Sequence, residues 1–293
     1  MSLSECPSGD SVIYKDWGWW SHYFLTEFRP LHAEVSLYDD NLADFCYERL
    51  GLFPGDRVLD AGCGAGDVAQ RLALRGIKVT GIDLSSELID HCRKVADTSS
   101  FPSGNAVFQV EDIRLPIPLE KFNAVICLGV TFGYFEDSIN RACFQNLARL
   151  LPKGGKLLIE SDDPFSLEEG WIEQGFRLKV DLETICTNQH SQTVPATLCL
   201  RRRFVKQTSS YEGFFHLELD DGRRIVLSQT LNQNYDGNRV CDERIRIYSK
   251  EELSEMAVHS GLVLEAVYGD SVLPEIDYIP GHSRRLVTQF FRP

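Results

Sequence analysis

The order of hydrophobic and polar positions predicts an alternating α/β fold for the first half of the chain. Short apolar runs, which are typical of buried strands, occur at residues 57–60, 78–83, 106–110, 123–129 and 156–161. Between several of these runs, apolar residues recur every three or four positions and predict helices, one of them over residues 138–151. Because strand and helix alternate five times, we expect right-handed crossovers and a doubly wound, mostly parallel sheet.

The pattern changes near residue 164. Three segments alternate polar and apolar positions, namely 197–205, 211–219 and 223–231. The turn sequence Asp220-Asp221-Gly222 separates two of them, so we expect antiparallel strands. A capping box at Ser249 and Glu252 then predicts a helix, and apolar runs at 262–269 and 284–291 predict two strands. We therefore expect an antiparallel β insertion over residues 164–247, before the last helix-strand pair.

The first 52 residues predict helices rich in aromatic side chains. Six aromatic residues fall between Tyr14 and Phe24, and residues 35–50 carry apolar side chains near helical spacing. Two interpretations are open: these aromatics pack the helices onto the sheet, or they form a lid that covers a bound ligand and excludes water. We treat residues 1–52 as a helical lid segment, and residues 53–163 with 248–293 as the ligand-binding domain.

Composition narrows the class of protein. The formal net charge of −13 would repel a phosphate backbone, so no nucleic-acid partner is expected. The nine cysteines are scattered without a C-x-x-C pair, which indicates reduced, buried thiols and neither a disulfide frame nor a metal site. The N-terminus shows no signal-like pattern, and no window approaches the roughly 18 to 20 apolar residues of a membrane span. We expect a cytoplasmic protein with no membrane partner; the oligomeric state is open.

The stretch from Arg57 to Gly66 concentrates the candidate chemistry. Glycines stand at positions 62, 64 and 66, between a predicted strand and a predicted helix. A sharp turn there needs positive φ, and a ligand lying against the backbone leaves no room for a Cβ. The next strand ends in Asp83, whose carboxylate can accept hydrogen bonds from a ribose diol. These features are typical of a nucleotide-binding βαβ unit.

The glycine spacing separates the possible ligands. A dinucleotide site reads G-x-G-x-x-G and holds a pyrophosphate at the helix N-terminus, whereas this loop reads G-x-G-x-G between Asp60 and Asp67. Two carboxylates favour a cation, and S-adenosylmethionine carries a sulfonium and an ammonium group. Residues 60–66 resemble the D-x-G-x-G-x-G motif of the class I S-adenosylmethionine-dependent methyltransferases.

The resemblance extends over nearly the whole chain, through VLDAGCGAGD, GIDLSSELI, FGYFED and PKGGKLLIE to the final strand. The chain is similar to bacterial small-molecule methyltransferases, in which an antiparallel insertion forms the roof of the substrate site. The resemblance implies S-adenosyl-L-methionine as cofactor, S-adenosyl-L-homocysteine as product and a small-molecule methyl acceptor. The cofactor contacts that it implies are Asp60, Gly62, Gly64, Gly66, Asp83, Leu84, Asp112, Ile113 and Leu128. For Asp112, a plain helix or turn cap is an equal alternative.

The acceptor is less well defined. Residues 128–131 read LGVT, in place of the Asn/Asp-Pro-Pro-aromatic motif of adenine and glutamine N-methyltransferases. A hydroxyl acceptor gains from a general base, whereas an amine needs only to be neutral. No His-Asp pair is apparent at the strand ends, and the candidate catalytic residues are His22 and His282.

We therefore lean slightly towards an amine acceptor. The candidate substrate contacts are Trp20, Tyr23, Phe132, Tyr134 and Asp162, the last of which would hold an ammonium group. Two alternative functions are a nicotinamide-dependent oxidoreductase and a protein that binds S-adenosylmethionine without turnover.

Overall fold

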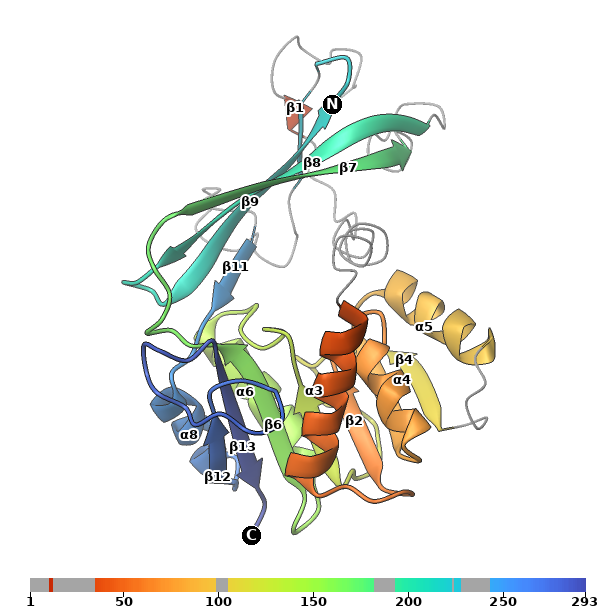
Figure 1. Ribbon diagram of the computed structural model, residues 1–293, viewed down its shortest axis with the longest axis vertical. Coiled ribbons are helices and arrows are strands. Elements are labelled where there is room, and N and C mark those ends of the chain that lie inside the picture. Colours follow the sequence, from red (N-terminus) through yellow and green to blue (C-terminus); the bar gives the residue numbers. More distant parts are fainter. Residues whose placement is uncertain (1–10, 13–34, 99–104, 182–192, 223, 228–242) are drawn as a thin grey trace. The chain divides into compact units, whose positions relative to one another are not determined.

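The computed structural model describes residues 11–12, 35–98, 105–181, 193–222, 224–227 and 243–293 (Figure 1). The chain divides into two compact units, the first formed by Met1–Leu31 with Glu168–Ile245 and the second by His32–Leu167 with Arg246–Pro293. Of residues 1–52, the structure describes a short strand and one helix. The predicted lid aromatics lie outside the described residues.

The second unit contains a seven-stranded sheet in the order β12-β13-β6-β5-β2-β3-β4. Its strands are β2 (Arg57–Ala61), β3 (Lys78–Asp83), β4 (Ala106–Val110), β5 (Ala124–Cys127), β6 (Lys156–Asp162), β12 (Val263–Tyr268) and β13 (Arg285–Phe291). Neighbouring strands from β6 to β4 are parallel, and β13 runs antiparallel to both β6 and β12. The predicted doubly wound, mostly parallel sheet is confirmed.

Helices cover both faces of this sheet (Figure 1). They are α3 (Val35–Leu50), α4 (Asp67–Leu74), α5 (Ser86–Thr98), α6 (Asp137–Arg149) and α8 (Lys250–His259). Successive side chains of a strand point to opposite faces. Val125 and Cys127 of β5 therefore pack in the core with α6 and α8, while Ala124 and Ile126 pack with α3, α4 and α5. Burial on both faces explains why these strands are apolar throughout.

Local signals set the helix ends. The Ser249 hydroxyl accepts from the Glu252 backbone N–H, and the Glu252 carboxylate accepts from the Ser249 backbone N–H, so the predicted capping box is confirmed. Ser85 caps α5 through a hydrogen bond of 3.1 Å from the Leu88 backbone N–H to its hydroxyl.

The prediction that strands and helices alternate strictly is wrong at one connection. Residues 111–123, which join β4 to β5, contain no helix. Pro116 and Pro118 lie in this segment. Proline lacks the backbone N–H that a helix interior needs, so a helix is disfavoured there.

The first unit is built on a six-stranded sheet in the order β1-β10-β9-β8-β7, with β11 paired to β9. Its strands are β1 (Ser11–Val12), β7 (Trp171–Asp181), β8 (Thr193–Val205), β9 (Ser210–Leu219), β10 (Arg224–Leu227) and β11 (Glu243–Arg246). The pairs from β7 to β10 are antiparallel, as the alternating sequence predicts. Strand β7 is an addition to the predicted set.

Two further features bear on the class of protein. None of the helices that the structure describes is both long and apolar enough to cross a membrane. The described cysteines are free thiols, at Cys46, Cys63, Cys92, Cys127, Cys143 and Cys199.

Candidate active site

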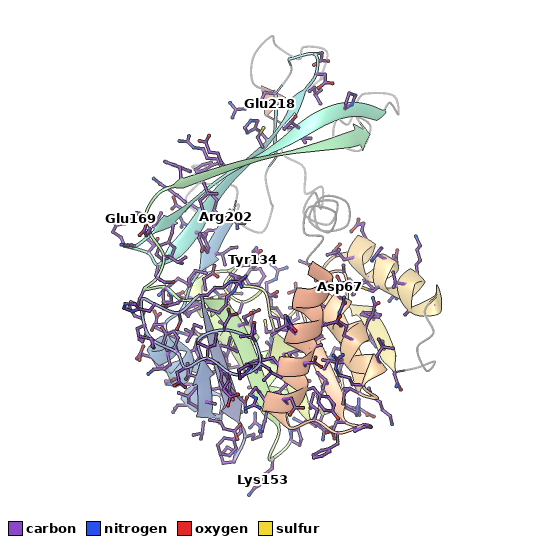
Figure 2. The ribbon with its side chains drawn as sticks, in the orientation of Figure 1. Asp67, Tyr134, Lys153, Glu169, Arg202 and Glu218 are labelled. Atoms are coloured by element: carbon purple, nitrogen blue, oxygen red, sulfur yellow. The ribbon has the colours of Figure 1, made fainter. Side chains whose placement is uncertain are left out.

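The carboxyl ends of β2 and β3 bring the glycine loop and Asp83 together. The backbone N–H groups of Gly62 and Cys63 donate to the carbonyl of Ile82, at 2.8 and 2.9 Å, so the loop leaves β2 and crosses towards β3. This is the edge of a parallel sheet at which α/β proteins bind ligands. Asp67 begins α4 (Figure 2) and brings a negative charge to the helix N-terminus, where a pyrophosphate would otherwise be favoured.

The three loop glycines serve different purposes. A Cβ on Gly62 would lie 2.2 Å from Cγ2 of Thr131, and a Cβ on Gly66 would lie 2.9 Å from Sγ of Cys92. These two glycines are therefore required by packing inside the protein. A Cβ on Gly64, where φ is +55°, would meet no atom within 4 Å. Gly64 thus presents bare backbone to open space, where a ligand can touch it.

Asp83 holds the middle of this loop. Its Oδ2 accepts from the Gly64 backbone N–H at 3.0 Å, and its Oδ1 accepts from the Ser85 backbone N–H at 2.9 Å. Burial raises the pKa of Asp83, although the backbone donors act in the opposite direction. A carboxylate has about four acceptor positions, so these backbone bonds still leave capacity for a ligand hydroxyl. The adjacent Leu84 is 39% exposed, which leaves an apolar side chain at the same edge.

Asp60 lies beneath the loop, at the end of β2. It is only 3% exposed, and burial together with the charge of Asp83 raises its pKa to about 7. Among the described residues, none donates a hydrogen bond to the Asp60 carboxylate. A buried carboxylate of this kind is stabilised in its ionised form by a nearby cation.

Asp112 is engaged by an arginine that the sequence analysis did not single out. Arg114 donates to both carboxylate oxygens, with Nε–Oδ1 at 3.0 Å and Nη2–Oδ2 at 2.6 Å, and its backbone N–H caps the turn at 2.9 Å. Partial burial acts to raise the pKa of Asp112, but the guanidinium outweighs it and the pKa is lowered. The guanidinium also lies over the ring of Phe135, at 5.0 Å. The hydrogen bonds show a turn cap, and an adenine contact stays a prediction. Ile113 packs against the core.

The turn after β5 has an unusual backbone. Gly129 and Val130 have φ angles of 64° and 62°, and the Thr131 backbone N–H donates to the Leu128 carbonyl at 3.2 Å. Two successive positive φ angles identify a primed turn, which normally uses Gly, Asn or Asp. For a branched residue such as valine this conformation costs about 1–2 kcal/mol. Leu128 itself is buried, and Val130 belongs to no sequence motif, because its special feature is its backbone conformation.

The described residues that were predicted to contact the methyl acceptor are Phe132, Tyr134 and Asp162, and they have different surroundings. Phe132 is only 2% exposed and packs against Phe144 and Tyr248 with ring centroids 6.0 and 5.5 Å apart, so this placement gives it a core role. Tyr134 is half-buried (Figure 2). Asp162 forms an ion pair with Arg285 of the neighbouring strand and is thereby already neutralised.

One of the two predicted catalytic histidines, His282, lies in the described part of the chain, where its ring contacts a backbone carbonyl. His282 is exposed, and its Nδ1 lies 3.3 Å from the Pro280 carbonyl. His22, Trp20 and Tyr23 lie outside the described residues. The catalytic and substrate-binding roles of all these residues therefore stay predictions.

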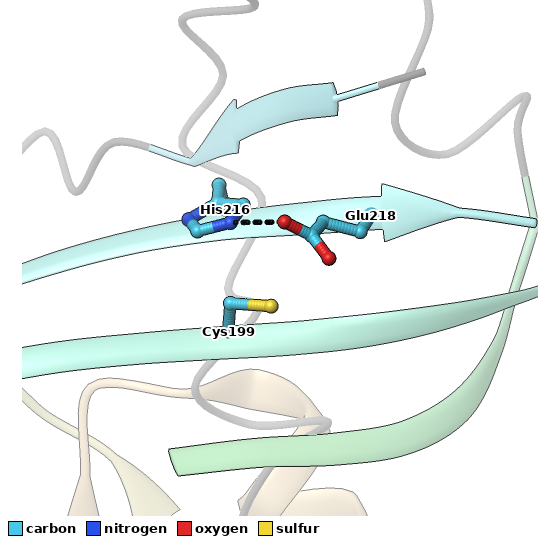
Figure 3. Close-up of side chains that lie close together, drawn as sticks. All are labelled: Cys199, His216 and Glu218. Atoms are coloured by element: carbon cyan, nitrogen blue, oxygen red, sulfur yellow. Dashed lines mark hydrogen bonds and ion pairs between the residues drawn. The ribbon is translucent and has the colours of Figure 1, made fainter. Parts of the chain in front are cut away.

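A second polar cluster lies on the sheet of the first unit. Cys199 faces His216 across β8 and β9, and Glu218 follows on the same face (Figure 3), with their ligand atoms within 4.8 Å of one another. Arg224 can only donate to the Nδ1 of His216, 3.1 Å away, so the ring hydrogen is on Nε2 and faces Glu218 at 3.2 Å. A metal on Nε2 would need the opposite tautomer, and burial raises the pKa of the Cys199 thiol. These contacts favour a hydrogen-bonded cluster over a metal centre.

Comparison with known proteins agrees with the geometry of the second unit. Residues 58–155 match the family described as a methyltransferase domain. The ubiquinone biosynthesis O-methyltransferase of Chromobacterium violaceum is 36% identical over 130 residues, which are 43% of this chain and 51% of that protein. The protein of the same description from Pseudomonas syringae pv. syringae is 34% identical over 149 residues, 49% of this chain and 57% of its own length. The chain spans about half the length of the curated relatives it matches.

Solved structures extend the likeness of the fold beyond that segment. The CcbJ methyltransferase from Streptomyces caelestis has a TM-score of 0.63 at 19% identity, over 86% of this chain and 89% of that one. The sugar N-methyltransferase KedS8 from a Streptoalloteichus species has a TM-score of 0.58 at 16% identity, over 100% of this chain and 98% of that one.

The sheet order, the glycine loop and the matched segment together define an α/β methyltransferase domain of class I. Residues 58–155 match the methyltransferase domain family, and the cofactor of this class of proteins is S-adenosylmethionine.

Proposed function

We propose that this protein transfers the methyl group of S-adenosylmethionine to a nitrogen of a small metabolite. The observation that carries the proposal is the edge at Gly64, where bare backbone in a left-handed conformation is held by the carboxylate of Asp83, with the buried Asp60 near the end of the adjacent strand β2. When bound, the cofactor supplies an electrophilic methyl group on a sulfonium, and the leaving group is the neutral thioether S-adenosylhomocysteine. The protein therefore has mainly to bind and align the two reactants and to exclude water from them.

The residues present fit this cofactor. Asp83 has free acceptor capacity for ribose hydroxyls, Gly64 leaves space for close backbone contact, and Asp60 supplies a buried negative charge for the cationic end. Leu84 offers an apolar side chain at the same edge. A pyrophosphate fits poorly, since Asp67 already places a carboxylate at the start of α4.

The preference for nitrogen rests on the chemistry of His282. An oxygen acceptor with a high pKa gains from a general base, and a base works best when a partner orients it. His282 is exposed, and its Nδ1 contacts the Pro280 carbonyl, so no carboxylate stabilises the protonated ring through this nitrogen. Proteins of similar fold include the sugar N-methyltransferase KedS8, whereas the curated relatives are ubiquinone biosynthesis O-methyltransferases, so the acceptor atom has to be measured.

The remaining segments complete the proposal. Residues 1–52, with Trp20, Tyr23 and His22, serve as the lid, and residues 164–247 serve as the roof of the acceptor site. This assignment is supported by the resemblance to small-molecule methyltransferases.

The proposal is tested in two stages. S-adenosylhomocysteine should raise the unfolding temperature of the protein, and NAD⁺ should leave it unchanged; the reverse result would favour an oxidoreductase. The protein is then incubated with a metabolite extract and S-adenosylmethionine that carries a ¹³C-methyl group. The carbon shift of the labelled product separates N-methyl from O-methyl. Cofactor binding with no labelled product from a broad panel of amines, phenols and acids would indicate a binding protein.

A further inference from the structure

A buried carboxylate interrupts the apolar run of the interior strand β6. Glu160 is 0% exposed, and it follows the buried apolar residues Leu157, Leu158 and Ile159. A strand buried on both faces normally carries apolar residues, and burying a carboxylate is costly even when it is hydrogen-bonded. A glutamate here is therefore poorly explained by stability alone.

Glu160 joins two segments that are far apart in the sequence. Its Oε2 accepts from the Gly129 backbone N–H at 2.8 Å, and its Oε1 accepts from the hydroxyl of Ser271. Ser271 is also 0% exposed. The carboxylate thus links the turn after β5 to the segment after β12.

The Gly129 bond lies at the start of the strained turn. Val130 holds a φ of 62°, which is an outlier for a branched residue, and such conformations persist only where the surroundings impose them. The next residue, Thr131, carries the contact to the cofactor loop, since its Cγ2 fills the space where a Cβ on Gly62 would lie. A chain of contacts therefore runs from Glu160 through the turn to the loop.

We propose that Glu160, supported by Ser271, is a positioning residue for methyl transfer. By holding the Gly129 N–H it keeps residues 128–131 in the left-handed turn, and the turn sets the position of Thr131 against the cofactor loop. The inference rests on the proposed function, because it places the turn where acceptor and cofactor meet. It assigns Glu160 no contact with either reactant.

The test is the variant Glu160→Gln, followed by hydrogen exchange and calorimetry with S-adenosylhomocysteine. Glutamine keeps the shape of the side chain, but it has no charge and a single accepting oxygen, so it can accept from only one of the two donors. Amide exchange in peptides covering 128–135 should become about tenfold faster, while peptides covering 78–83 keep their protection. The affinity for S-adenosylhomocysteine should fall roughly three- to tenfold, through the loosened Thr131 contact.

A second substitution separates positioning from general stability. Glycine adopts positive φ without strain, so Val130→Gly in the Glu160→Gln background should return both exchange and affinity to within about twofold of the unsubstituted protein. The matched control is Glu265→Gln, which removes an exposed carboxylate of β12 that bonds Gln289 and should leave the turn unchanged. Should Glu160→Gln fail to fold, Ser271→Ala should raise exchange about threefold in the same peptides.

Three results would overturn the inference: unchanged exchange at 128–135, an equal rise in all peptides of the sheet, or no rescue by Val130→Gly. Binding of S-adenosylhomocysteine to the unsubstituted protein is measured first. Its absence would refute the proposed function, whereas intact binding without a local exchange effect would refute only the role of Glu160.

Discussion

The two sheets of this protein distribute their polar residues in opposite ways. In the seven-stranded sheet, the central strand β5 is buried along its whole length, and polar groups gather where the strands end. In the six-stranded sheet, polar groups run along one face of the strands. There Glu212, 5% exposed, lies between Arg203 and Arg244, and Arg201 lies over the ring of Trp171 at 3.9 Å.

The difference follows from how the sheets are covered. Helices bury both faces of the parallel sheet, so a ligand can bind only at the edge formed by the carboxyl ends of its strands. The antiparallel sheet buries residues such as Phe204 and Leu217 on one face, and the other face carries paired charges. Substitutions at the carboxyl edge of the seven-stranded sheet should therefore change ligand affinity. Substitutions on the charged face of the six-stranded sheet should change local stability.

The largest effect on affinity is expected at Gly64. In Gly64→Val, the side chain enters the open space beside the loop, and the affinity for S-adenosylhomocysteine should fall at least about a hundredfold in calorimetry. The control is Gly154→Val, because Gly154 also has a positive φ, of 81°, and open space around it, but precedes β6 at the opposite edge. Both variants should lose about 1–2 kcal/mol of unfolding free energy. Equal affinity in the two would mean that the loop does not touch the cofactor.

Asp83 should show the next largest effect. Asp83→Asn removes a charge-assisted acceptor for the ribose and weakens the grip on Gly64, so affinity should drop at least about tenfold. Because Asp83 also accepts from the Gly64 and Ser85 backbones, the unfolding temperature should fall as well. Asp56→Asn is the control, since Asp56 accepts from the Phe53 backbone at the distant end of β2. Unchanged affinity in Asp83→Asn would remove Asp83 from the site.

Asp60 should make cofactor affinity depend on pH. Its pKa of about 7 means that the free protein holds a proton there below neutrality, and the ammonium group of S-adenosylhomocysteine favours the ionised form. Affinity for S-adenosylhomocysteine should therefore fall as the pH drops from about 8 to about 6, by at most about tenfold per pH unit. In Asp60→Asn this dependence should vanish, and calorimetry at several pH values checks it.

The same carboxylate should affect stability with a defined sign. The pKa of Asp60 is raised on folding from 3.8 to about 7, so the folded state retains a proton that the unfolded state has lost. The destabilisation by Asp60 then grows as the pH rises from about 4 to about 7 and stays constant above. Without ligand, Asp60→Asn should melt at a higher temperature than the unsubstituted protein at pH 8, and the gap should shrink towards pH 5. A gap that widens at low pH would contradict this assignment.

The smallest effect on affinity is expected at Glu212. Glu212→Gln leaves the guanidinium groups of Arg203 and Arg244 without their buried carboxylate, which should destabilise the antiparallel sheet by up to about 3 kcal/mol. Hydrogen exchange at residues 196–219 should accelerate, while the affinity for S-adenosylhomocysteine stays within about twofold. A large loss of affinity would show that this face also supports the cofactor site and would weaken the contrast between the two sheets.

Much of the fold could be predicted from the sequence, because its signals are local. The apolar runs at 78–83 and 106–110 coincide with β3 and β4, and residues 35–50 form α3. The capping box at Ser249 depends on residues three positions apart. Strand periodicity, helix caps and glycine spacing are all set by neighbouring residues, so they can be recognised before the chain is folded.

Other properties depended on residues that are distant in the sequence. Glycine spacing does not reveal that a Cβ on Gly62 would collide with Thr131, or that Gly64 faces open space. The aromatic Phe132 looked suited to a pocket, yet packing against Phe144 and Tyr248 buries it.

The sequence by itself determined the α/β class, the glycine loop and the acids at the strand ends, since these follow from local pattern. Only the tertiary structure decided the partners of those acids, such as Arg285 for Asp162, and it alone revealed the buried Glu160 with its partners Gly129 and Ser271. The physical reason is that a carboxylate's pKa, burial and freedom to bind a ligand depend on the groups that folding brings around it, and segment order alone does not specify those groups.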